Sequence, residues 1–132
     1  MAELKTPQRP LSPHLQIYRP MLSMMMSIIH RITGFALFFG TALFVWWLYA
    51  AANSPQAFEL TQNFFGHWFG RLVLFGFTWA LLHHALGGLR HFIWDTGRGF
   101  ELATVERLVK ANLIGSIVLT LLLWAIAYGV YL

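Results

Sequence analysis

The sequence contains no cysteine among its 132 residues. This absence excludes disulfide bonds, iron–sulfur clusters held by thiolates, and haem attached covalently through a C-x-x-C-H motif. Any redox cofactor that this chain holds must therefore be bound through histidine, methionine or weaker contacts.

Charged side chains are also scarce. Nine basic and five acidic residues make up 11% of the chain, whereas an ordinary soluble domain has about 25%. A soluble protein this small has a large surface relative to its volume, and so few charges cannot cover it. The chain is 58% hydrophobic and 17% aromatic. The composition therefore favours a membrane protein over a soluble or disordered one, and despite the net charge of +4 we expect no nucleic-acid partner.

Three apolar runs dominate the sequence; they lie at residues 32–52, 72–89 and 111–132. A helix needs about 20 residues to cross the hydrocarbon core of a bilayer. The pattern predicts an all-α membrane protein with transmembrane helices at about 22–52, 64–94 and 108–132. Residues 1–20 form an N-terminal segment, residues 21–132 form one three-helix anchor domain, and loops are expected around residues 53–63 and 95–110.

The basic residues indicate how the chain crosses the membrane. All of them except Arg71 either flank the start of the first helix or lie between the second and third helices. The positive-inside rule then places the N-terminus in the cytoplasm and the C-terminus in the periplasm. The sequence shows neither a cleavable signal peptide nor an Arg- and Ser-rich presequence. We therefore expect a multi-pass protein of the bacterial inner membrane rather than of the mitochondrial one.

The second helix carries ionisable groups inside its apolar run, which is costly in a bilayer and indicates a function. Gly76, Ala80, His84 and Gly88 recur every four residues, so one imidazole projects from a groove of small residues. A flat macrocycle such as haem needs an axial nitrogen with that kind of space beside it. Alternatively, His84 is a packing residue bonded across a close helix contact, or belongs to a proton or metal pathway. The pathway would need acidic residues, and the three apolar runs contain none.

A second polar cluster lies at the start of the first helix, where Ser27 and Arg31 share a face with His30 beside them. These side chains could hydrogen-bond a quinone carbonyl or haem propionates, since a guanidinium binds carboxylates through two N–H groups. Alternatively, Arg31 only reaches out to lipid headgroups. His30 and His67 are expected near the two membrane surfaces, and His83 faces another side of the same helix. A second haem ligand should therefore come from another subunit.

Three motifs occur in order along the chain: RPLSPHLQIY at residues 9–18, SIIHRITG at 27–34 and HALGGLRHFIWD at 84–95. Together with the three-helix pattern, they resemble the cytochrome b subunit family of succinate dehydrogenase, also called complex II. The resemblance extends over essentially the whole chain.

The resemblance implies a membrane-anchoring haem b subunit that is not an enzyme on its own. It would help electrons from succinate pass through the iron–sulfur subunit to ubiquinone. Its partners would be that subunit, the flavoprotein subunit, the lipid bilayer and a second small membrane anchor, which joins the helical bundle and supplies the other haem ligand. The resemblance assigns His84 as axial ligand, His30, Arg31 and His91 to the haem propionates, and Ser27 and Arg31 to the quinone site. A haem-free anchor, with His84 used only in packing, is the alternative.

Overall fold

A computed structural model describes residues 16–131, so most of the predicted N-terminal segment and of the motif at 9–18 lies outside the described residues. The described part is helical and contains no strand. In chain order the helices are α1 (Leu22–Asn53), α2 (Pro55–Gly66), α3 (Trp68–Asp95) and α4 (Leu102–Tyr131). Three of them, α1, α3 and α4, are long and apolar enough to cross a membrane. The all-α fold with three candidate membrane spans is therefore confirmed.

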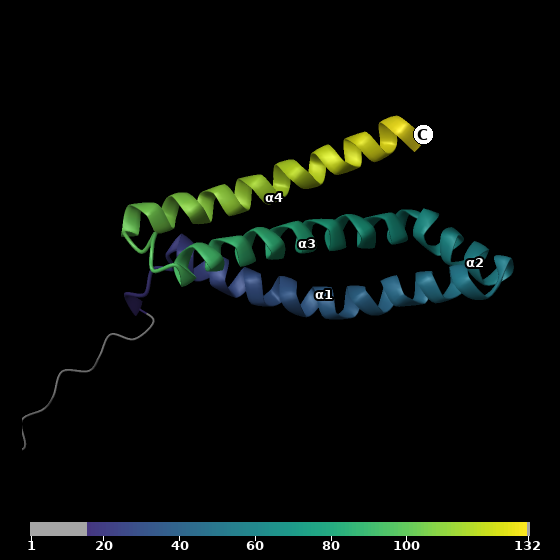
Figure 1. Ribbon diagram of the computed structural model, residues 1–132, viewed down its shortest axis with the longest axis horizontal. Helices are drawn as coiled ribbons and strands as arrows, with labels where there is room; N and C mark the ends of the chain where they lie inside the picture. Colours follow the sequence, from purple (N-terminus) through teal and green to yellow (C-terminus); the bar gives the residue numbers. More distant parts are fainter. Residues whose placement is uncertain (1–15, 132) are drawn as a thin grey trace, which may run out of the picture.

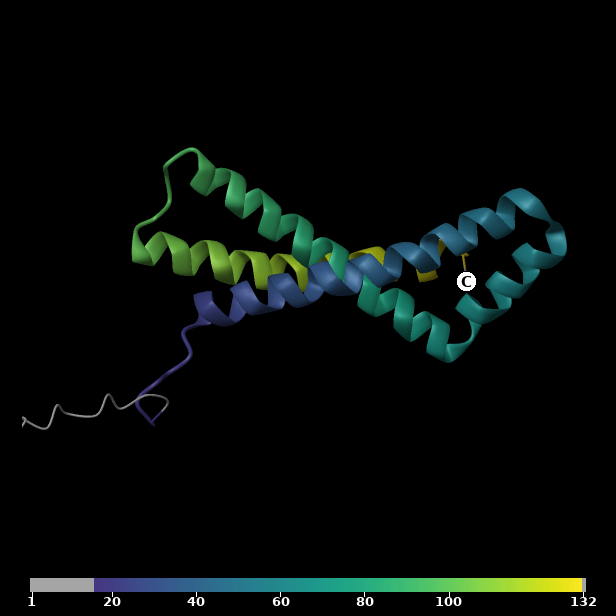
Figure 2. The ribbon, with the colours of Figure 1, turned by 90° about the horizontal axis from the view of Figure 1, so that it is seen from below.

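The long helix α3 lies between α1 and α4 and packs against both (Figure 1). Seen from below, α3 crosses the other two at an angle, and the helices diverge toward their ends (Figure 2). The start of α1 and the α3–α4 connection lie at one end of the bundle. The short helix α2 and the end of α4 lie toward the other end. The two ends of the described chain therefore lie toward opposite ends of the bundle.

The surface of the bundle is apolar and its interior is partly polar. Large hydrophobic side chains face outward from all three long helices, for example Phe38, Leu72 and Ile126, which are 74%, 58% and 61% exposed. The buried polar or charged residues outnumber the buried hydrophobic ones among the described residues; they are Thr33, Thr61, His83, Arg90, Asn112, Ser116 and Thr120. This distribution suits a protein whose outer surface meets lipid or other membrane helices.

The loop expected around residues 53–63 is instead the helix α2. Ser54 begins it as N-cap, because its Oγ accepts a hydrogen bond from the backbone N–H of Ala57 at 3.1 Å. Pro55 occupies the first helical position, where its missing N–H costs nothing. The chain turns at His67, and α3 therefore begins at Trp68 rather than near residue 64.

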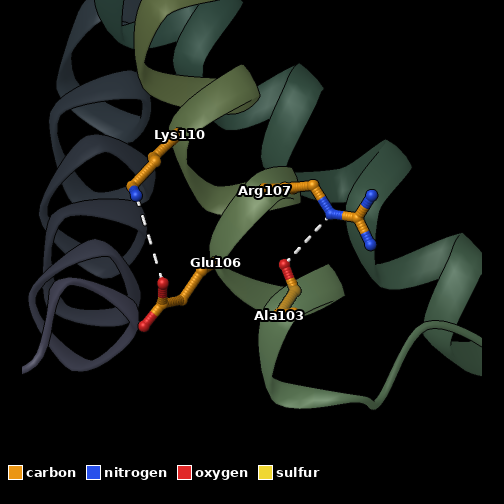
Figure 3. Close-up of polar contacts among 4 residues, drawn as sticks. All are labelled: Ala103, Glu106, Arg107 and Lys110. Atoms are coloured by element: carbon orange, nitrogen blue, oxygen red, sulfur yellow. Dashed lines mark hydrogen bonds and ion pairs between the residues drawn. The ribbon is translucent and has the colours of Figure 1, made fainter.

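The second expected loop, around residues 95–110, is also shorter than predicted. Gly97 and Gly99 adopt positive φ angles of 75° and 78° after the end of α3, a conformation that favours glycine. Helix α4 then begins at Leu102 rather than near residue 108. Its exposed first turns carry the Glu106–Lys110 ion pair, with 4.0 Å between its charged atoms, and a hydrogen bond from Arg107 Nε to the Ala103 carbonyl (Figure 3). These charged residues lie on the turns of α4 that precede the apolar run at residues 111–132.

Candidate functional site

His84 lies on the face of α3 that packs against α1, and its imidazole is half-buried. The approach is close because α1 has Gly34 at the contact. A side chain placed there would begin 2.9 Å from His84 Cε1. Gly34 of the neighbouring helix therefore borders this imidazole, in addition to the small residues of α3 on its own face.

The hydrogen bonds of His84 determine which of its nitrogens carries the proton. Nδ1 lies 3.1 Å from the backbone carbonyl oxygen of His30 and 3.3 Å from Thr33 Oγ1. A carbonyl can only accept, so Nδ1 must donate to it. The Thr33 hydroxyl donates to the same carbonyl at 2.9 Å. Neutral His84 then has a lone pair on Nε2, and no hydrogen bond within residues 16–131 reaches that atom.

The ring of His30 stacks on His84, with 3.9 Å between ring centroids and 15° between planes. His91 meets the edge of His30 at 5.4 Å. The structure therefore brings His30, His84 and His91 together at the end of the bundle that carries the α3–α4 connection. No group of three or more histidine, cysteine or acidic side chains in the described part of the chain is arranged to hold a metal ion by itself.

Ser27 and Arg31 lie one turn apart on α1, and both side chains are exposed. Their spacing places them on the same face of the helix. Neither makes a hydrogen bond or ion pair with another described residue, so both polar groups are available to a molecule outside this chain. They are close to His30 in the sequence.

The glycines of α3 fall into two groups. Gly87 is buried against His30, whereas Gly76 and Gly88 have no atom of another part of the chain within 4 Å of the position of a Cβ. Gly88 lies one turn beyond His84 on the same face. The open glycine positions therefore leave room beside His84 on the surface of this chain.

Two polar side chains of α3, His83 and Arg90, are buried, which we did not expect from the sequence. His83 is only 1% exposed, and its Nδ1 lies 3.2 Å from both Ser116 Oγ and Asn112 Nδ2 of α4. Arg90, which the sequence analysis used only for topology, is 5% exposed, and its guanidinium lies 5.1 Å from the ring centre of Trp94. Residues 83, 87, 90 and 94 share one face of a helix, and that spacing could have indicated a buried polar face.

A family model described as the succinate dehydrogenase/fumarate reductase transmembrane subunit matches residues 5–123 of this chain. The chain belongs to this family. The similar proteins include the succinate dehydrogenase cytochrome b556 subunit of Paracoccus denitrificans, 45% identical over 122 residues that cover 92% of this chain and 94% of that protein. The cytochrome b556 subunit of Rickettsia typhi is 38% identical over 117 residues, covering 89% and 91% of the two chains.

A mitochondrial member is also similar: the cytochrome b560 subunit of Sus scrofa is 39% identical over 108 residues, covering 80% of this chain and 62% of that protein. The resemblance seen in the three motifs is thereby confirmed. Together with the three apolar helices, the bacterial relatives also confirm a multi-pass protein of the bacterial inner membrane.

Proposed function

We propose that this chain is the membrane-anchoring haem b subunit of a succinate dehydrogenase, which helps to pass electrons from succinate, through the iron–sulfur subunit, to ubiquinone. The observation that carries the proposal is the hydrogen bonding of His84, which fixes the tautomer of its imidazole. Its Nδ1 donates to a backbone carbonyl, and no described residue hydrogen-bonds to its Nε2. Histidines that bind metals have this arrangement, because the hydrogen bond orients the ring and fixes the tautomer.

The residues around His84 fit a haem. His84 Nε2 would be one axial ligand, and the open positions at Gly76 and Gly88 leave space beside the imidazole. When bound, the haem supplies a centre that accepts and returns single electrons near the quinone site. The second axial ligand would come from a second small membrane-anchor subunit packed against this chain. His30, His91 and Arg31 can donate hydrogen bonds to the propionates.

Ser27 and Arg31 are proposed to bind ubiquinone at the membrane edge. The Ser27 hydroxyl donates a hydrogen bond to one quinone carbonyl. The Arg31 guanidinium supplies positive charge that stabilises the quinone oxygen as it gains electrons. Two electrons from the iron–sulfur subunit and two protons from the cytoplasm convert the quinone to the quinol. The iron–sulfur subunit, which carries the flavoprotein, would dock at the end of the bundle formed by the start of α1 and the α3–α4 connection.

Replacing His84 tests the proposal directly. In the purified complex, His84→Leu should abolish or strongly weaken the b-type absorption band after reduction with dithionite, while the protein stays in the membrane. His67→Leu is the matched control, since His67 is exposed at the opposite end of the bundle, and it should keep the band. A normal band in the His84→Leu complex would show that His84 is not the ligand.

A second candidate is a haem-free anchor in which His84 only packs. The hydrogen bond from His84 to the His30 carbonyl and the close approach at Gly34 favour it, because a packing histidine would make the same contacts. The absorption spectrum of the purified wild-type complex separates the two candidates. A haem-free anchor leaves only the flavin and iron–sulfur contributions.

A further inference from the structure

His83 of α3 is buried inside the bundle, although neither the proposed haem site nor the proposed quinone site uses it. Its side chain is only 1% exposed. An imidazole in a membrane helix is costly unless it is hydrogen-bonded. The partner of His83 is Asn112 of α4, which is itself only 5% exposed. The two residues therefore form a buried polar contact between two apolar helices.

The amide of Asn112 contacts His83 at two points. Its Nδ2 lies 3.2 Å from His83 Nδ1 and 3.3 Å from the backbone carbonyl oxygen of His83. A carbonyl can only accept a hydrogen bond, so the amide group that faces it is the NH₂ group, which has two hydrogens to donate. One is donated to the carbonyl and the other to Nδ1. Asn112 thus holds both the backbone and the side chain of His83, and we call this pair the Asn112–His83 clamp.

The next residue of α3 bonds the helix on its other side. Successive side chains of a helix point about 100° apart, and here they bond different neighbours. His83 bonds α4, whereas His84 Nδ1 donates to the carbonyl of His30 in α1 at 3.1 Å. Rotation of α3 about its own axis would strain both hydrogen bonds. The two histidines therefore fix the rotation of α3 between the other two long helices.

We propose that the Asn112–His83 clamp positions His84 for haem binding, so that α4 contributes to the haem site through α3. This inference rests on the proposed function of His84. Hydrogen bonds behind a metal-binding histidine orient its ring and tune the bound metal. The bond to the His30 carbonyl orients the ring of His84, and the clamp holds the α3 backbone from which that ring projects. Asn112 and His83 are thus positioning residues rather than ligands.

Asn112→Leu tests the clamp, because leucine is similar in shape but cannot donate a hydrogen bond. In the purified complex, transfer of haem to excess apomyoglobin should show an affinity about tenfold lower, at the lower end of the range for outer-shell hydrogen bonds. The midpoint potential and the EPR signal of the remaining haem should shift. Thr120→Val is the matched control. Thr120 is also buried on α4, at 1% exposed, but its hydroxyl donates only to the Ser116 carbonyl of its own helix. This variant should behave like wild type.

Two substitutions of His83 separate positioning from packing. His83→Asn keeps an acceptor near the place of Nδ1, which the amide of Asn112 can still reach. His83→Gln places its acceptor near the place of Nε2, beyond the clamp. The potential and EPR signal of the haem should therefore stay close to wild type in His83→Asn. In His83→Gln both should shift in the same direction as in Asn112→Leu.

The proposal is wrong if the haem of Asn112→Leu is unchanged, or if His83→Asn and His83→Gln shift its properties equally. If Asn112→Leu does not assemble, the two His83 variants decide. A density map of the wild-type complex without the bond between Asn112 Nδ2 and His83 would overturn the proposal by itself. All these results would leave the b-type band of the wild type in place, and with it the proposed function. A wild-type complex without that band would overturn both.

Discussion

At the scale of single residues, the tautomer of His84 depends on a side chain that α1 lacks, because position 34 is glycine. The carbonyl of His30 accepts from the Thr33 hydroxyl at 2.9 Å, and it shares its remaining side with the imidazole of His84. The residue four positions later would ordinarily cover that carbonyl with its side chain, but here it is Gly34. The imidazole of His84 fills the uncovered space and donates to the carbonyl at 3.1 Å. A glycine in one helix thus fixes the tautomer of a histidine in another.

Gly34→Ala should therefore weaken haem binding without touching the ligand itself. The added methyl begins 2.9 Å from His84 Cε1, so the ring must move and its bond to the His30 carbonyl must lengthen. Loss of such an orienting hydrogen bond reduces metal affinity by about 10–100-fold. The measurement is the ratio of haem to flavin in the purified complex. Gly129→Ala, where a methyl meets no atom of this chain, is the control, and an unchanged ratio in Gly34→Ala would contradict the argument.

Ser27→Ala and Arg31→Ala should impair quinone reduction selectively. Loss of a neutral hydrogen bond of about 1 kcal/mol predicts a decrease of several-fold for Ser27→Ala. Removal of the positive charge predicts a larger decrease for Arg31→Ala, of about 10²–10³-fold. Succinate oxidation with a soluble dye should persist in both. Arg31→Lys, which keeps the charge but not the planar fork, should fall between wild type and Arg31→Ala. An equal loss of both activities would indicate failed assembly instead.

At the scale of elements, the apolar runs predicted the spans well and the connections poorly. A run without charges fixes a membrane helix because every backbone polar group must be satisfied inside it, and α1 accordingly covers almost the predicted range. Helix α2 was missed because Asn53, Ser54 and Pro55 look like a turn. The same Ser-Pro pair is also the N-cap and first-turn signature of a helix, so the signal for α2 was present in the sequence.

The Ser54 cap gives a prediction for α2. Ser54→Ala removes the hydrogen bond to the backbone N–H of Ala57, and an N-cap of this kind contributes about 1 kcal/mol. Amide hydrogens of α2 should then exchange about fivefold faster, as measured by hydrogen–deuterium exchange and mass spectrometry of the complex. Ser54→Asp, which can still cap the helix, should exchange like wild type. Faster exchange in both variants would mean that the side-chain cap is not what stabilises α2.

At the scale of the whole molecule, the contacts between helices could not be predicted from the sequence. Residue spacing placed His84 among small residues of its own helix, but the positions of Gly34 and Thr33 opposite it depend on how α1 and α3 cross. The same holds for His83, whose partners Asn112 and Ser116 come from α4. A helical period describes one face of one helix, and only the packed bundle shows which polar faces meet.

The direction in which the bundle crosses the membrane is a property of the whole chain, and the absence of cysteine makes it directly testable. Single cysteines can be introduced as Gln56→Cys in α2 and Glu101→Cys in the α3–α4 connection. Both positions are exposed, and they lie at opposite ends of the bundle. The positive-inside rule predicts that the α3–α4 connection, with Arg98, Arg107 and Lys110 near it, faces the cytoplasm. A membrane-impermeant maleimide should then label Gln56→Cys in spheroplasts. It should label Glu101→Cys only in inverted vesicles, and the reverse pattern would place the N-terminus in the periplasm.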